Sequence, residues 1–89
     1  MSAAQLTGNI HPTAIVDEVA WVHPSAVIER HVDIDAQAWI GNGAWVRHHA
    51  WIGFGAVIGE GTSVPPHQVV SDGAVLPCHG FRFALLAVR

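Results

Sequence analysis

An aliphatic residue recurs at every sixth position through most of this chain. Twelve successive hexads run without a gap from Ile10 to Phe81. Their first positions are all aliphatic: Ile10, Val16, Val22, Ile28, Ile34, Ile40, Val46, Ile52, Ile58, Val64, Val70 and Leu76. Their fifth positions are small, mostly alanine, with Gln68 the clear exception. An unbroken internal repeat of this kind predicts a solenoid, because one repeat alone has no core to bury.

The hexad length indicates a triangular β-solenoid. Each hexad supplies a short strand and a corner, so three hexads close one coil and twelve hexads make four coils. Adjacent coils then pair as parallel strands about 4.8 Å apart, and each coil covers the apolar face of the next. We expect glycines to serve the corners, where positive φ or tight packing is needed. These glycines are Gly41, Gly43, Gly53, Gly55, Gly59, Gly61 and Gly73.

Composition agrees with an all-β fold and excludes several classes of protein. Val and Ile supply 19 of the 89 residues and Leu only 4, a balance that favours strands. Hydrophobic residues make up 51% and charged residues 12%, which argues against disorder. The chain has no Lys and a formal net charge of −3, so a nucleic-acid-binding surface is not expected.

The N-terminal sequence and the single cysteine indicate the expected cellular compartment of the protein. Cys78 alone can form neither an internal disulfide nor a cysteine zinc site. We find no signal-peptide pattern and no apolar run of membrane-spanning length, and we expect a cytoplasmic protein. We divide the chain into a leader or N-terminal cap at 1–9, the repeat at 10–81 and a C-terminal cap at 82–89.

Residues 18 apart should stack in such a solenoid, so columns of the sequence become stripes on the surface. The sixth positions should point outward, and one of their columns is apolar in every coil: Trp21, Trp39, Val57 and Val75. A continuous outward apolar stripe indicates an interface between copies of the chain. The alternative is that the tryptophan rings lie flat on their own coils or under the terminal segments.

Two further columns carry polar side chains. His31, His49 and His67 occupy the fourth position of one corner, where stacked imidazoles could coordinate a metal or form a simple polar surface ladder. In the other column, Glu29 and Arg47 should meet as an ion pair between neighbouring coils. No phosphate-binding loop, CxxC motif or serine nucleophile elbow is present.

The repeat over residues 10–81 resembles the hexapeptide-repeat family, whose fold is a left-handed parallel β-helix. The segments IHPTAIV at 10–16 and IGEGTSVPPHQVV at 58–70 are similar to the N-terminal region of the acyl-ACP–UDP-N-acetylglucosamine O-acyltransferases of lipid A biosynthesis. This resemblance implies a homotrimer without a bound cofactor. It also implies transfer of an acyl group from acyl carrier protein to a UDP-N-acetylglucosamine-type sugar.

The resemblance allows two alignments with different consequences for catalysis. In the alignment with more identities, 10–16 and 58–70 are one coil further apart than in the family, and the chain ends before the catalytic coil. Weak or absent activity is then expected. In the other alignment, VRHHAWIG at 46–53 matches the catalytic coil and His48 is the general base. The two alignments exclude each other, and we favour the alternative that His48 is an ordinary surface histidine, one of seven histidines in the chain.

Two other functions stay open at this level. A non-catalytic β-helical module for assembly would need only the apolar stripe. A metal-dependent protein resembling the β-helical carbonic anhydrases would need histidines on neighbouring coils, such as His31, His49 and His67. That family's characteristic pair of histidines five residues apart is absent here.

Overall fold

The computed structural model of this protein describes residues 9–77, which form twelve strands of two residues each and no helix. Among these described residues, therefore, no helix is available to cross a membrane. The strands are β1 (Asn9–Ile10), β2 (Ile15–Val16), β3 (Trp21–Val22), β4 (Val27–Ile28), β5 (Asp33–Ile34), β6 (Trp39–Ile40), β7 (Trp45–Val46), β8 (Trp51–Ile52), β9 (Val57–Ile58), β10 (Ser63–Val64), β11 (Val69–Val70) and β12 (Val75–Leu76).

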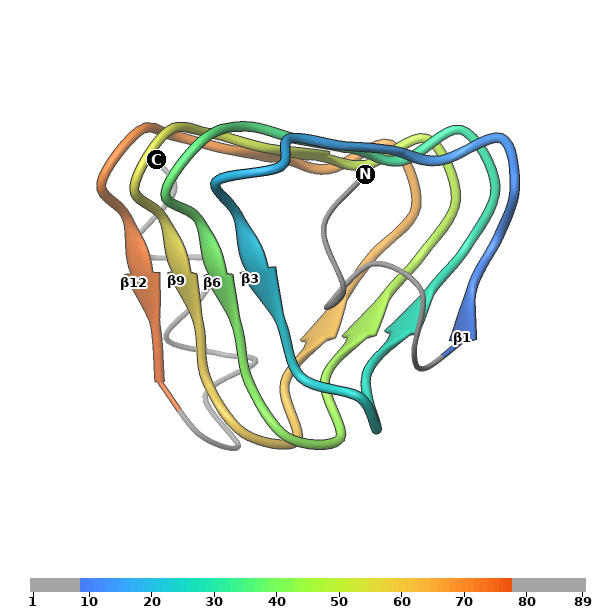
Figure 1. Ribbon diagram of the computed structural model, residues 1–89. Coiled ribbons are helices and arrows are strands. Elements are labelled where there is room, and N and C mark those ends of the chain that lie inside the picture. The colour runs from blue at the N-terminus through green and yellow to red at the C-terminus, as the bar shows by residue number, and fades with distance from the viewer. Residues whose placement is uncertain (1–8, 78–89) are drawn as a thin grey trace.

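Every third strand belongs to the same parallel sheet, so the chain winds as a triangular prism (Figure 1). The three sheets contain β1-β4-β7-β10, β2-β5-β8-β11 and β3-β6-β9-β12, and we call them the β1, β2 and β3 sheets. The register repeats after one coil, with Trp21 opposite Trp39 and Trp39 opposite Val57. The expected parallel β-helix of about four coils is confirmed.

The two residues of each strand face opposite ways, which explains the hexad pattern. First-position side chains such as Val22, Ile40 and Ile58 are buried on the axis of the prism, and sixth-position side chains face outward. The small fifth-position residues, such as Ala26 and Ala44, are buried beside them at the corners. A core of alternating large and small side chains therefore runs along the whole solenoid, as interiors at close packing require.

Backbone hydrogen bonds join each coil to the next and also close each corner. Trp21 N–H, for example, donates to the carbonyl of Ala38 at 2.9 Å, and His23 N–H donates to that of Ile40 at 2.9 Å. Within the corner, Ala26 N–H donates to the carbonyl of His23 at 2.9 Å. Strands of only two residues are stable here because both neighbouring coils and both flanking corners satisfy their backbone groups.

Corner glycines serve the two purposes expected from the sequence. Glycines at the fourth position have positive φ, as at Gly43 with φ of 71°. Those at the second position permit close approach instead. A Cβ atom on Gly53 would overlap the Asp72 carboxylate and lie 2.8 Å from the carbonyl oxygen of Val70. These positions fix how tightly one coil stacks on the next.

The predicted terminal segments fall almost entirely outside the described residues. Asn9, the last residue of the predicted leader at 1–9, pairs with Val27 in the β1 sheet. The rest of that leader, the predicted cap at 82–89, and Cys78 lie outside the range that the structure describes.

Candidate functional site

One corner of the prism carries a column of histidines in an uncommon backbone conformation. His31, His49 and His67 have φ of 58°, 63° and 62°, the left-handed region that favours glycine. Hydrogen bonds to the preceding coil hold the backbone there: His49 N–H donates to the Arg30 carbonyl at 3.1 Å, and His67 N–H donates to the His48 carbonyl at 3.0 Å. The rings follow one another at centroid distances of 5.0 Å and 4.7 Å. The predicted stacking of these three residues is therefore present.

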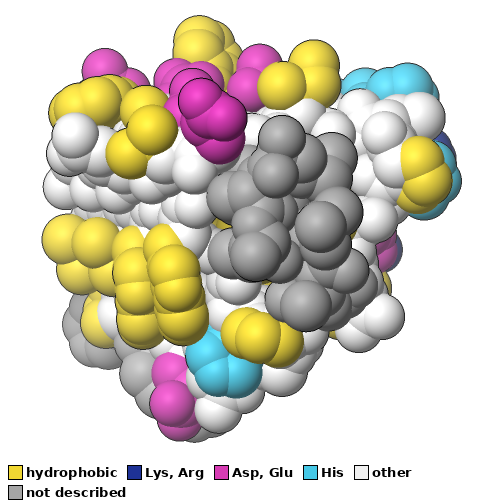
Figure 2. Space-filling view, in the orientation of Figure 1, with side chains coloured by type: hydrophobic (Ala, Val, Ile, Leu, Met, Phe, Trp, Pro, Cys, Tyr) yellow, Lys and Arg dark blue, Asp and Glu magenta, His cyan; other side chains and the backbone are white. Residues whose placement is uncertain are grey.

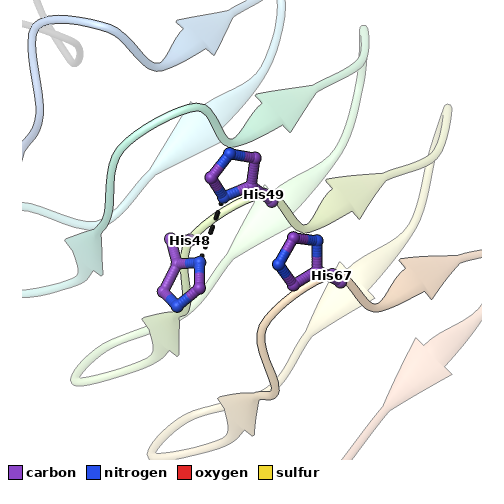
Figure 3. Close-up of side chains that lie close together, drawn as sticks. All are labelled: His48, His49 and His67. Atoms are coloured by element: carbon purple, nitrogen blue, oxygen red, sulfur yellow. Dashed lines mark hydrogen bonds between the residues drawn. The ribbon is translucent and has the colours of Figure 1, made fainter.

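His48 adds a fourth ring to this corner from the neighbouring position of the hexad. Its Nδ1 lies 3.0 Å from Nδ1 of His49, and its ring stands nearly perpendicular to the rings of His49 and His67 (Figure 3). One ligand nitrogen from each of these three histidines lies within 4.8 Å of the other two. We call His48, His49 and His67 the histidine trio. It brings together a candidate base and two candidate ligands, whereas His31 lies outside this group.

The electrostatic environment favours a neutral imidazole at His49. Burial, followed by the charges that His67, His31, His48 and Arg30 would carry, lowers the pKa of His49 below its ordinary value of 6.5. A neutral imidazole is the form that accepts a proton or binds a metal ion. His49 is thus suited to either chemistry near neutral pH.

An open groove of about 810 Å³ lies beside the trio, along β1 and β4 and next to the end of β7. His48 lines it together with His11, Arg30, Arg47 and Glu29, over an apolar floor that includes Ile28. Arg30 and Arg47 are the two arginines within residues 9–77. A groove with two guanidinium groups and an imidazole at its edge is suited to an anionic ligand such as a phosphate ester.

Glu29 contacts three neighbouring residues at this groove. Its Oε2 lies 3.3 Å from Arg47 Nε, which confirms the predicted ion pair, and it accepts a hydrogen bond of 2.6 Å from Trp45 Nε1. Its Oε1 accepts a 2.9 Å hydrogen bond from the backbone N–H of His48. Burial raises the pKa of Glu29, but these hydrogen bonds and the Arg47 charge outweigh that effect and lower the pKa below 4.5.

Carboxylates also fix two of the four tryptophans, a feature that the columns did not predict. Trp45 binds Glu29, and Trp51 Nε1 donates to Asp35 Oδ2 at 3.2 Å. The Arg47 guanidinium carbon lies 4.3 Å from the centre of the Trp45 ring, a cation–π contact. The indoles of Trp45 and Trp51 are therefore held by contacts with neighbouring side chains of the same solenoid.

The other two tryptophans form the predicted apolar stripe. Trp21 and Trp39 stack with ring centroids 5.2 Å apart and planes 8° from parallel, and Val57 and Val75 continue the column on β9 and β12. Trp21, Trp39 and Val75 are 40%, 41% and 55% exposed. Figure 2 shows these hydrophobic side chains gathered over the β3 sheet, on the left of the view. We call Trp21, Trp39, Val57 and Val75 the tryptophan stripe.

No protein-family model matches this chain, and neither a curated protein nor a solved structure matches it. The fold is therefore inferred from the structure alone. The resemblance to acyltransferases remains an expectation from the sequence, either at 10–16 and 58–70 or, in the other alignment, at 46–53.

Proposed function

We propose that this protein is a sugar O-acyltransferase of low activity that acts on a UDP-N-acetylglucosamine-type substrate with acyl-ACP as donor. The observation that carries this proposal is the position of His48 at the edge of the groove that Arg30 and Arg47 also line. The two guanidinium groups are suited to the phosphates of a nucleotide sugar. The groove volume of about 810 Å³ is within the range of small-molecule sites.

The proposed reaction uses His48 as a general base. Its neutral imidazole takes the proton of a sugar hydroxyl while the hydroxyl oxygen attacks the thioester carbonyl of the donor. The tetrahedral intermediate then collapses to the sugar ester, and the carrier thiol leaves with a proton. Glu29 acts as a positioning residue, because its hydrogen bond of 2.9 Å fixes the backbone of His48. No covalent acyl-enzyme is needed, since the thioester is already activated.

Low activity is expected because the solenoid is short. The described coils span roughly 15–20 Å along the axis at the usual strand spacing. A donor with a pantetheine arm and a nucleotide sugar together need a longer and more enclosed site. The open side of the groove would have to be walled by another subunit.

Acyl transfer from acyl-ACP to UDP-N-acetylglucosamine tests this proposal directly. Release of the carrier thiol and the mass of the acylated sugar nucleotide are measured for the parent, His48→Ala and His23→Ala. Slow turnover by the parent that falls about 10²–10⁴-fold in His48→Ala is expected, with little change in His23→Ala, which does not line the groove. The proposal fails if the parent shows no turnover or if His48→Ala retains the parent rate.

A second function is favoured by the tryptophan stripe. Stacked, half-exposed Trp21 and Trp39 on a flat sheet suit a β-helical module whose role is assembly with copies of itself. Such a module would form an oligomer through the β3 sheet and would show no transfer. Measuring mass in solution together with turnover therefore separates the two functions.

A further inference from the structure

We propose that the histidine trio, His48, His49 and His67, is a binding site for Zn²⁺ or a similar late transition-metal cation. The three side chains come from two consecutive coils and meet at the corner that follows β7 and β10 (Figure 3). Their ligand nitrogens all lie within 4.8 Å of one another. This inference is independent of acyl transfer.

One nitrogen–nitrogen distance in the trio is close to that of a three-histidine metal site. Two nitrogens bound to one tetrahedral Zn²⁺ at about 2.0–2.1 Å are separated by roughly 3.3 Å. The two Nδ1 atoms of His48 and His49 are already 3.0 Å apart. His67 is solvent-exposed, so a rotation of its side chain can bring its nitrogen to the same distance.

The backbone at this corner sets the direction of two of the imidazoles. The fourth position is glycine, with positive φ, at Gly43, Gly55, Gly61 and Gly73. His49 and His67 adopt the same conformation, as do His31 and Gln37, and it is unfavourable for a residue with a Cβ atom. Conformations of this kind persist where the surrounding structure holds them, and they cluster at functional sites. Here they orient two imidazoles side by side, with ring planes only 13° apart.

The donor set indicates which metal fits and what it would do. Three neutral imidazoles suit Zn²⁺, Cu²⁺ or Ni²⁺ rather than Mg²⁺ or Ca²⁺, which prefer oxygen. Because the corner is exposed, a fourth position would stay available to water, as in zinc sites that bind a substrate. A metal at the trio would occupy the lone pair that His48 needs as a base. The metal-bound form is thus distinct from the acyl-transferring form.

The test is zinc titration of the untagged chain after treatment with EDTA, using competition with a chromophoric zinc chelator. One Zn²⁺ per chain is expected for the parent. His67→Gln should weaken binding by at least about 10–100-fold, the loss typical of even an outer-shell substitution. His31→Gln is the matched control, because His31 shares the column and the backbone conformation but lies outside the trio. It should bind zinc as the parent does.

Two results would overturn the site: a parent that binds no zinc, or equal weakening in His31→Gln and His67→Gln. Urea unfolding in EDTA shows whether each variant is folded. If His67→Gln does not fold, His67→Asn replaces it, because asparagine tolerates positive φ. Acyl transfer is not part of this readout, so the zinc site and the proposed enzyme can fail separately.

Discussion

The indole of Trp45 donates a 2.6 Å hydrogen bond to Glu29, which belongs to the preceding coil. Trp51 and Asp35 repeat the relationship at 3.2 Å on the next face of the prism. In both pairs an outward ring is fixed to the solenoid by an acid 16 residues earlier. Trp21 and Trp39 instead stack on each other. The four tryptophans therefore divide into two that stabilise coil stacking and two that form an apolar face.

Glu29→Gln should destabilise the protein, because Glu29 is the shared acceptor for Trp45, His48 and Arg47. Hydrogen bonds to a charged group are worth about 1.5–3 kcal/mol, and glutamine retains part of the geometry. We expect the free energy of unfolding to fall by about 1–2 kcal/mol, measured by urea denaturation at pH 7. The exposed Glu18→Gln is the control and should leave the urea midpoint unchanged.

The lowered pKa of Glu29 predicts that the protein loses stability in acid. The pKa of Glu29 is lower in the folded protein than its ordinary value of 4.5. Its contribution is therefore complete above pH 4.5 and disappears as the pH falls through the folded-state pKa. The difference in unfolding free energy between the parent and Glu29→Gln should shrink between pH 5 and pH 3. A difference that stays constant over that range would contradict this prediction.

Trp39→Glu should dissociate the oligomer that we expect to form through the tryptophan stripe. A charge placed against stacked Trp21 in a buried interface is costly, and hot-spot residues of this kind contribute about 2 kcal/mol or more. Light scattering at micromolar concentration should show a trimer for the parent and a monomer for the variant. Ile15→Glu, at a 66% exposed site on the β2 sheet, should remain a trimer. A monomeric parent would rule out this interface.

The column of His31, His49 and His67 should lower the free energy of unfolding of the metal-free protein at mildly acidic pH. The pKa of His49 is lowered on folding by burial and by the charges of His67, His31, His48 and Arg30. The unfolded chain therefore binds more protons than the folded one just below pH 6.5. Stability is complete above that pH and falls below it. Urea midpoints in EDTA at pH 7.5 and 5.5 should separate more for the parent than for His49→Gln, and equal losses would exclude the column as the cause.

Gly53→Ala should destabilise the stack of coils. The added methyl group would overlap the Asp72 carboxylate and lie 2.7 Å from the Asp72 backbone nitrogen. Overpacking of this kind costs about 1–3 kcal/mol. Gly43→Asn is a suitable control, because the space beside Gly43 is open and asparagine tolerates its positive φ. Thermal denaturation should show a clear fall in midpoint for the first variant and a small change for the second.

The sequence was sufficient to predict the coils and the columns. A period of six places Val22 and Ile40 inward and Trp21 and Trp39 outward, and a multiple of 18 residues sets the register, as the pairing of the strands confirms. The Glu29–Arg47 ion pair was predictable for the same reason, since both residues lie in one column. The repeat therefore predicts which residues lie in the same column on the surface.

Relations between different positions of the hexad were not predictable in this way. The bond from Trp45 to Glu29 joins a sixth position to a second position, and its length depends on how the indole lies along the coil. The contact between His48 and His49 depends on the corner conformation, because adjacent residues usually point apart. The groove depends on the directions of the side chains that line it, among them Arg30, Arg47 and His48. These features arise from side-chain directions at a turn, which a column of residues does not specify.

The pairing of Trp21 with Trp39, and of Trp39 with Val57, means that one coil ends where the next begins in register. Adding or removing one whole coil should therefore leave the geometry of the other coils unchanged. Copying a single coil within the gene would lengthen the tryptophan stripe and the histidine column together, one rung at a time. Loss of one residue would instead turn every later inward side chain away from the axis. A chain of this design can therefore change the reach of its surfaces by duplication, but it tolerates few small insertions.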